Sequence, residues 1–480
     1  MNTEWEVVIG LEVHVELATK SKIFCSCTTE FGGAPNTHCC PVCMGMPGTL
    51  PVLNRQVLAY AVMAGLALNC TIENETRFDR KNYFYPDLPK AYQISQLYRP
   101  IAHDGHVEIN VNGRVKKIGI HEMHMEEDAG KLIHSDFGNE TYPDYNRCGI
   151  PLLEIVSEPD FRSAEEVSAY LEKIRSLFTY LGISDCKMQE GSMRADVNLS
   201  VRKAGEKTLG TRTEMKNINS IKAIERAIKD EANRQIELLL RGQSITQETR
   251  HWDDDKRSSY AMRSKENAQD YRYFPEPDIP VIFVEKEYID AVRSSLPEFM
   301  EEKRERFARQ YSLSDYDAGL LAANRKQAEL YEEVVDGGAN PKAAANWLIV
   351  QLARVLKDLG KDFEEISVSS CELAKLINYV EEGKANRKDG IDVLHEMLRR
   401  GISFDVAGYM QEHGLFITDD GAGLLEAVQK VILANDKAVG EYKGGKEKAI
   451  GFLVGQVMRQ GSGKFHPVAV REAMEKELKK

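Results

Sequence analysis

Polar side chains, several of them acidic, recur at alternate positions in two segments whose patterns are those of half-buried β-strands. Between residues 5 and 17 every odd position is apolar, whereas the even positions include Glu12, His14 and Glu16. Successive side chains of a strand point to opposite faces, so these three residues share a polar face. A solvated surface is the ordinary explanation of such a face. That explanation weakens because residues 193–202 repeat the pattern, with a polar face of Arg194, Asp196, Asn198, Ser200 and Arg202.

Two further segments carry acids and bases in the same manner. One of them places Arg212, Glu214 and Lys216 on one face. The other opens with Asn112-Gly113, which predicts a tight hairpin turn. Its return strand changes apolar parity between Ile120 and Met123, as a bulge or a strand end would, so parity leaves open whether Glu126 or Glu127 faces the site. The polar residues at its end are His121, Glu122, His124, Glu126, Glu127 and Asp128.

These four segments predict one antiparallel sheet that gathers carboxylates and cationic side chains on a concave face. Carboxylate oxygens suit Mg²⁺, which binds nucleotide phosphates, and Arg and Lys can neutralise phosphate oxygens. Arg194 and Lys216 are therefore candidates for phosphate contacts, and Asn198 on the same face is a further nucleotide-binding candidate. The sequence has no G-x4-G-K-[ST] loop, no G-x-G-x-x-G after a strand and no G-x-S-x-G elbow. If the chain handles ATP, it does so on the sheet face.

Five of the nine cysteines lie between residues 25 and 43. Cys25 and Cys27, then Cys40 and Cys43, form two short-spaced pairs, which is typical of structural four-thiolate zinc sites. Unliganded thiols are one alternative, and a reactive thiol assisted by His38 is another. A catalytic site seldom needs four cysteines, so we predict a zinc knuckle that braces the fold. The spacing leaves open whether Cys39 replaces Cys40.

Length and composition limit the class of protein. A chain of 480 residues predicts two or three domains. The net charge of −12 argues against nonspecific coating of nucleic acid, although residues 406–480 carry 11 Lys and Arg against 10 Asp and Glu. No apolar run is long enough for a membrane span, and the N-terminus lacks the pattern of a secretory signal. We therefore expect a cytoplasmic protein without a membrane segment.

The sequence pattern changes from alternation to helical spacing near Leu296. Residues 296–313, 317–335, 344–360 and 369–383 have the apolar periodicity of amphipathic helices. We predict an α+β fold in which an antiparallel-sheet cradle domain is followed by two helical domains. The predicted bounds are 1–295 for the cradle, 296–405 for the all-helical domain and 406–480 for a small helical tail domain.

Eight strings, in chain order over roughly 270 residues, resemble the B-subunit family of aspartyl/glutamyl-tRNA amidotransferases. Residues 451–467 also resemble the tail domain of that family, so the likeness covers the whole chain. The strings are GLEVHVEL, FDRKNYFYPDLPKAYQISQ, HMEEDAGK, PLLEIVSEPD, EGSMRADVNLSVR, TEMKNINS, QETRHWDD and DYRYFPEPDIP.

The resemblance implies a ligase reaction on a misacylated tRNA, Glu-tRNA(Gln) or Asp-tRNA(Asn). With ATP and Mg²⁺, the family's members phosphorylate the side-chain carboxylate of the attached amino acid. Ammonia that a glutaminase partner releases from glutamine then displaces the phosphate, and a small third protein completes a heterotrimer. The sequence lacks the Ser-Ser-Lys machinery of amidase-type glutaminases, so the chain itself is not expected to make ammonia. It is also too short for the extra domain of archaeal relatives, which favours the bacterial three-protein form.

By position, the resemblance assigns the magnesium site to Glu12, His14, Glu127 and Asp196. Glu126 and Glu214 are second choices. Lys216 is also a catalytic candidate, from the strand-face pattern alone. On its own, His14 would more often be a hydrogen-bonding partner than a magnesium ligand. Zinc is implied only as a structural ion.

The segment around residues 80–93 is rich in aromatic and basic side chains. Its ordinary explanation is an aromatic corner that packs against the sheet. By resemblance it lines the cradle where the 3′ end of the tRNA arrives, which makes Lys81 and Tyr83 binding candidates. The terminal adenine is expected to stack on Tyr83 or Tyr85. In the tail, lysines lie around Gly444-Gly445 and around residues 461–463. The ordinary explanation is that they are solvated surface side chains. By resemblance they contact the outer corner of the tRNA.

Two other functions compete with an ATP-dependent transamidation function. A tRNA-binding scaffold whose partner performs the chemistry would not need convergent carboxylates. A free-standing carboxylate–amine ligase for a small molecule would not need the basic tail. The carboxylate-bearing strands therefore favour the first function.

Overall fold

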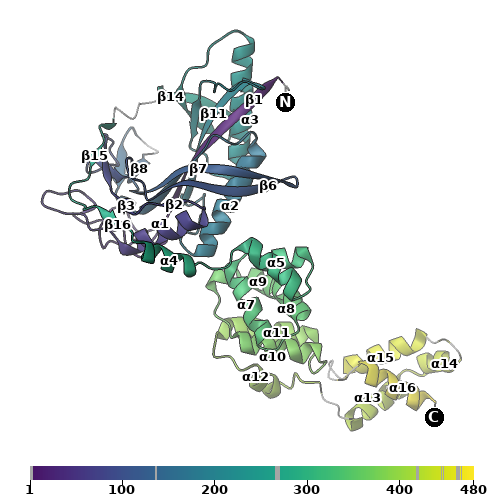
Figure 1. Cartoon of the computed structure of the whole chain (residues 1–480). Coiled ribbons are helices and arrows are strands. Elements are labelled where there is room, and N and C mark those ends of the chain that lie inside the picture. The colour runs from purple at the N-terminus through teal and green to yellow at the C-terminus, as the bar shows by residue number, and fades with distance from the viewer. Residues whose placement is uncertain are drawn as a thin grey trace. The chain divides into compact units, whose positions relative to one another are not determined.

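The computed structural model describes residues 4–135, 138–264, 271–417, 421–444, 446, 448–460, 465 and 467–479. The chain divides into two compact units, Met1–Glu298 and Phe299–Lys480. The first unit contains every strand of the described residues, and the second consists of helices (Figure 1). The division lies close to residue 296, where the apolar pattern of the sequence changes.

A nine-stranded sheet forms the centre of the first unit, in the order β14-β13-β12-β11-β1-β10-β7-β6-β2. All neighbouring strands are antiparallel except β12 and β13, which are parallel. The parallel pair makes the sheet mixed. The predicted α+β fold is confirmed, and the four segments from which the sheet was predicted lie in its antiparallel part. Its strands are β1 (Trp5–Glu16), β2 (Thr71–Ile72), β6 (Ala102–Val111), β7 (Arg114–Glu127), β10 (Pro151–Ser157), β11 (Met193–Lys203), β12 (Thr213–Lys216), β13 (Glu248–Asp253) and β14 (Ser258–Ser264).

Three helices cover one face of this sheet: α1 (Arg55–Ala67), α2 (Ala164–Leu181) and α3 (Ile221–Leu240) (Figure 1). From Val7 onward the odd-numbered apolar residues of β1 are buried, as the alternation predicted. Burial of this apolar face is the main favourable term that holds the helices on the sheet. The even-numbered side chains of β1 are consequently left on the opposite face.

The hairpin of β6 and β7 forms as Asn112-Gly113 predicted. Both turn residues have positive φ, 54° and 79°, as the favoured two-residue hairpin turn requires. Further along, Ile120 pairs with Ser157 while Glu122 pairs with Val156, so His121 is an extra residue in β7. This bulge explains the parity change in the sequence, because one inserted residue reverses which side chains face the core.

Short strands surround the end of β7. β5 (Tyr92–Ser95) packs against it, β4 (Asp79–Asn82) pairs with β5, and β15 (Phe274–Pro275) pairs with β4. Arg80 fixes this arrangement by donating two hydrogen bonds to Glu276, at 2.7 and 2.9 Å. The remaining elements of the first unit are β3 (Glu75–Thr76), β8 (Lys131–His134), β9 (Thr141–Asp144), β16 (Ile282–Phe283) and α4 (Lys286–Ser294).

The second unit contains helices at each predicted segment, with two differences. Residues 317–335 form two helices, because Asn324 ends the first and caps the second with its side chain. Residues 344–360 run through a π-helical turn at Trp347–Leu352. The elements are α5 (Met300–Gln310), α6 (Asp315–Ala322), α7 (Arg325–Asp336), α8 (Pro341–Asn346), α9 (Ala353–Leu359), α10 (Ser370–Glu381), α11 (Arg387–Arg400), α12 (Val406–Glu412), α13 (Gly421–Ala434), α14 (Asp436–Lys443), α15 (Lys448–Gln460) and α16 (Pro467–Leu478).

Two separate hydrophobic cores lie within the second unit. The first core includes Val406 and Met410 of α12, and Phe416 packs against it. The second core begins with Leu424. The change from one core to the other thus falls after Phe416, later in the chain than the predicted bound at 405. The glycine-rich segment 461–463 lies outside the described residues, among which no helix is long and apolar enough to cross a membrane.

Candidate active site and cysteine site

Three groups of ionisable side chains follow one another along the polar face of β1. Glu12, His14 and Glu16 each belong to one group, and the strand rise places successive members about 7 Å apart. The strand register extends each group sideways. Glu12 lies opposite Asp196 of β11, and His14 lies opposite both Arg194 of β11 and Glu154 of β10.

The first group consists of Glu12, Asp196 and Glu214, whose carboxylates offer three oxygens within 4.8 Å of one another. Lys216 donates a hydrogen bond to Asp196 at 2.5 Å and lies 3.4 Å from Glu214. Burial, followed by repulsion from Glu154, Glu214 and Asp196, raises the pKa of Glu12. Three carboxylates against one lysine leave excess negative charge, and this all-oxygen donor set fits Mg²⁺.

The second group consists of His14, Glu126 and Glu154, again with ligand atoms within 4.8 Å of one another. The Nε2 atom of His14 lies 3.5 Å from Glu126 and 3.3 Å from Glu154. His124 approaches the same Glu154 at 3.2 Å. Burial opposes protonation of His14, but Glu154 and then Glu126 outweigh it and raise its pKa to about 9. A nitrogen donor makes this set less typical of Mg²⁺ than the first group.

The third group joins two acids to two arginines. Arg194 donates to Asp128 at 2.9 Å, and Arg147 lies 3.4 Å from the same carboxylate. Glu16 is close to Asp128, and burial followed by the charge of Asp128 raises the pKa of Glu16 to about 8. A carboxyl group with this pKa holds its proton over much of the neutral range.

A cavity of about 520 Å³ opens beside the first group. Its volume is in the range of pockets that hold small-molecule ligands. Asn198, which lines the cavity, donates a hydrogen bond to Glu12 at 3.0 Å and so holds that carboxylate at the rim. The polar side chains of the lining are Glu12, Ser157, Asn198, Ser200, Thr211, Arg212 and Gln247.

Lys81 approaches the second group through aromatic side chains. Its ammonium lies 5.9 Å from the ring centre of Tyr83 and 5.0 Å from that of Tyr271. Burial opposes its charge, but Tyr273 and the carboxylates of Glu126 and Glu154 outweigh that effect and raise the pKa of Lys81. A permanently charged ammonium here would attract an anionic ligand.

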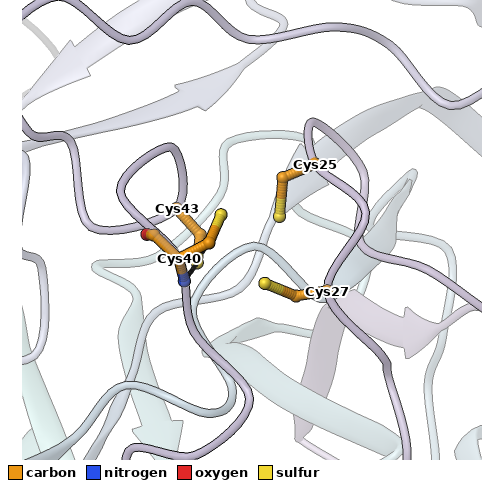
Figure 2. A group of neighbouring side chains, drawn as sticks. All are labelled: Cys25, Cys27, Cys40 and Cys43. Carbon is orange, nitrogen blue, oxygen red and sulfur yellow. Dashed lines mark hydrogen bonds between the residues drawn. The ribbon is translucent and has the colours of Figure 1, made fainter.

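The four cysteines of the predicted knuckle converge from two loops, as Figure 2 shows. Their sulfurs lie within 4.8 Å of one another, and those of Cys40 and Cys43 are 3.9 Å apart. Tetrahedral zinc with bonds of about 2.3 Å would separate its sulfurs by about 3.8 Å, so the group is compatible with zinc. Cys39 instead directs its thiol to the carbonyl of Asn36 at 3.3 Å. All nine cysteines are free of disulfides.

Comparison with known proteins matches both units of the chain. Residues 7–290 match the family model described as the GatB/GatE catalytic domain, and residues 329–478 match the GatB domain. This chain therefore belongs to the GatB family. The B subunit of the aspartyl/glutamyl-tRNA(Asn/Gln) amidotransferase of Lachnoclostridium phytofermentans is 53% identical over 99% of both chains. The protein of the same name from Caldicellulosiruptor bescii is also 53% identical, and that from Thermoanaerobacter pseudethanolicus is 50% identical, each over 99% of this chain and 100% of the relative.

The family's predicted metal ligands fall into two neighbouring groups instead of one. Glu12 and Asp196 lie in the first group with Glu214, and His14 lies in the second. Of the two adjacent glutamates, Glu126 is the one that reaches His14. Glu127 turns to the other face of β7, where it pairs with Lys90 and accepts a hydrogen bond from the amide of Ile94 at 2.9 Å. This placement does not support Glu127 as a ligand of either group.

The remaining predicted residues are distributed over all three groups. Lys216 and Asn198 adjoin the first group, Lys81 and Tyr83 lie at the second, and Arg194 belongs to the third. Arg194, predicted as a phosphate contact, is held by Asp128, so the second group separates it from the 520 Å³ cavity beside the first group.

Sequence reasoning missed Glu154 and did not single out His124. Glu154 lies in the mostly apolar segment PLLEIVS, where a single acid has no periodic pattern that would predict the face to which it points. A signal for His124 was present, because the parity of Met123 and Met125 places Glu122, His124 and Glu126 together on the opposite face. Following that parity through the bulge would also have selected Glu126 over Glu127.

Proposed function

We propose that this chain is the component of a tRNA-dependent amidotransferase that activates and amidates the amino acid of a misacylated tRNA. The names of its relatives indicate the substrates, Glu-tRNA(Gln), Asp-tRNA(Asn) or both. One observation carries the proposal of an ATP-using site. Two groups of convergent carboxylates, compatible with cations, stand about 7 Å apart on one strand.

The chemistry requires activation because a carboxylate has no adequate leaving group for an amine. A side-chain carboxylate oxygen attacks the γ-phosphorus of ATP, and the bond to the β–γ bridging oxygen breaks to release ADP. Ammonia then attacks the carbonyl carbon of the acyl phosphate. Inorganic phosphate leaves, and the nitrogen loses a proton to give the amide. Positive charge near the transferring phosphoryl group lowers the barrier of the first step.

We assign the first group and the cavity beside it as the binding site for ATP. Mg²⁺ held by Glu12, Asp196 and Glu214 would supply positive charge beside the phosphate oxygens. Lys216 adds a fixed positive charge at the same place, and Arg212 lines the cavity with another. Asn198 holds the carboxylate of Glu12 in position through its hydrogen bond.

We assign the second and third groups as the binding site for the acceptor amino acid. Lys81 attracts its side-chain carboxylate toward His14, so that the acceptor oxygen faces the phosphates at the neighbouring group. Tyr83, which lies against Lys81, offers a ring on which the terminal adenine of the tRNA can stack. Because the groups share one strand, donor and acceptor are held at a fixed separation, which favours in-line transfer.

The other parts of the chain have supporting roles in this proposal. The four-cysteine group holds a structural zinc ion, and the helical tail contacts the tRNA through phosphates. A separate glutaminase of the same amidotransferase supplies ammonia, and a small third protein completes the heterotrimer. The described residues in our proposed site include no serine–lysine arrangement that could hydrolyse glutamine.

The test is ATP hydrolysis by the reconstituted enzyme, with and without misacylated tRNA, using ammonium chloride as the nitrogen donor. Glu12→Gln and Asp196→Asn should each lose at least about 10²-fold in tRNA-dependent turnover, since each removes a ligand from the first group. Asp253→Asn is the matched control, because Asp253 also pairs with a lysine, Lys256 at 2.8 Å, at the edge of the sheet. Full activity in both site variants would favour the scaffold function instead.

A further inference from the structure

Lys22 is a completely buried lysine beside the four cysteines. Its ammonium lies 3.7 Å from the sulfur of Cys43 and 3.4 Å from the carbonyl oxygen of Tyr145. No carboxylate among the described residues forms an ion pair with this ammonium. The sequence pattern gave no sign of the contact, because Lys22 precedes the cysteine cluster and resembles any surface lysine.

The backbone of Lys22 belongs to the first cysteine loop, where its amide donates to the carbonyl of Cys27 at 3.0 Å. Its side chain crosses to Cys43 on the second loop and to Tyr145 on the segment after β9. One residue therefore links both cysteine pairs and an adjoining segment. The contacts of the Lys22 ammonium are specific to the cysteine site, because its polar partners are the sulfur of Cys43 and the carbonyl of Tyr145.

The charge of Lys22 has to be compensated within this contact set. Burying an ammonium without an anionic partner costs several kcal/mol, and a single carbonyl at 3.4 Å offsets only part of that cost. The sulfur of Cys43 is the one group in contact that can carry a full negative charge. Zn²⁺ with four thiolates has a net charge of −2, and one neighbouring lysine reduces it to −1.

We propose that Lys22 is a positioning residue of the cysteine site, whose positive charge stabilises the metal-bound thiolate of Cys43 and thereby strengthens metal binding. The attraction is greatest when all four sulfurs are thiolates around a cation. Removing the charge should therefore weaken metal binding more than it disturbs the fold. This role is independent of the proposed transamidation.

The experiment compares the full-length chain with three variants of Lys22 and one control. Lys22→Met keeps the length of the side chain without the charge, Lys22→Gln keeps a hydrogen-bond donor without the charge, and Lys22→Arg keeps the charge. Lys20→Met is the control, because Lys20 is an exposed lysine two residues away. Zinc affinity is measured by competition with a chromophoric chelator, and Co²⁺ substitution reports the sulfur-to-metal charge-transfer band.

We expect Lys22→Met and Lys22→Gln to bind zinc about 10- to 100-fold more weakly, as outer contacts to metal ligands typically do when lost. Their Co²⁺ charge-transfer band should move to lower energy, because an uncompensated thiolate gives up charge more readily. Lys22→Arg should recover most of the affinity, and Lys20→Met should equal the wild type. Wild-type affinity and band position in both neutral variants would overturn the proposal. So would failure of both to form a tetrahedral Co²⁺ site at saturation, because Lys22 would then serve the fold.

Discussion

Replacing Glu154 by glutamine tests the second group most directly, because one carboxylate serves two histidines there. Glu154 lies 3.3 Å from His14 and 3.2 Å from His124. Raising the pKa of His14 from 6.5 to about 9 corresponds to about 3 kcal/mol of interaction with the protonated ring, at about 1.4 kcal/mol per pKa unit. After the opposing effect of burial, Glu154 is the largest contributor, so Glu154→Gln should remove most of this energy.

The effect must depend on pH in a definite direction. The folded-state pKa of His14 is above its ordinary value, so the stabilisation is fully present below pH 6.5 and is lost as the pH rises through about 9. We expect Glu154→Gln to lower the free energy of local opening by about 2–3 kcal/mol at pH 6. The difference from the wild type should shrink as the pH approaches 9.

Hydrogen exchange of peptides from β1, β7 and β10, without added divalent cations, measures this opening locally. Glu158→Gln is the matched control, because Glu158 pairs with His121 at 3.0 Å on an exposed part of the sheet. An exposed pair contributes at most about 1 kcal/mol. The reasoning is refuted if Glu154→Gln has no larger effect than the control, or an effect that is constant between pH 6 and pH 9.

Three further outcomes follow from the same arrangement. The raised pKa of Glu16 stabilises the folded protein below about pH 4.5, and this stabilisation is lost as the pH rises to about 8. The variant Glu16→Gln should therefore lose less stability than the wild type between these two pH values. Thermal unfolding at a series of pH values measures the difference. Tyr83→Ala should weaken binding of aminoacyl-tRNA by about 1–3 kcal/mol if the terminal adenine stacks there, whereas a loss confined to Tyr85→Ala would place the adenine on Tyr85; filter binding of both variants measures this. Removing the residues after Ile417, where the first helical core ends, should weaken tRNA binding and reduce its salt dependence, whereas unchanged affinity and salt slope would exclude a role for the tail.

The local features of the fold could be predicted from the sequence, because short-range patterns determine them. The alternation of apolar and polar residues predicted β1 and the shared polar face of Glu12 and His14, and Asn112-Gly113 predicted the hairpin turn. The spacing of the cysteines predicted that four sulfurs converge, those of Cys25, Cys27, Cys40 and Cys43. In each case the residues that meet are close in the chain or repeat with a known period.

The division of the site into two groups could not be predicted, because it depends on which strands become neighbours. Glu154 reaches His14 only because β10 lies between β1 and β7, and Asp196 reaches Glu12 from a strand about 180 residues away in the chain. Lys22 was missed for a related reason. Its function depends on a loop 21 residues later, and a lone lysine has no periodicity to reveal its burial.

The position of β1 in the middle of the sheet makes the proposed active site intolerant of changes in chain length. Both edges of β1 are hydrogen-bonded, so the strand cannot slide to absorb an added or missing residue between Trp5 and Glu16. A single-residue deletion before Glu12 would rotate every later side chain of the strand by half a turn and direct Glu12, His14 and Glu16 into the helix-covered core. Substitutions can therefore tune this strand, but in the proposed reaction its length fixes the distance between the first and second groups.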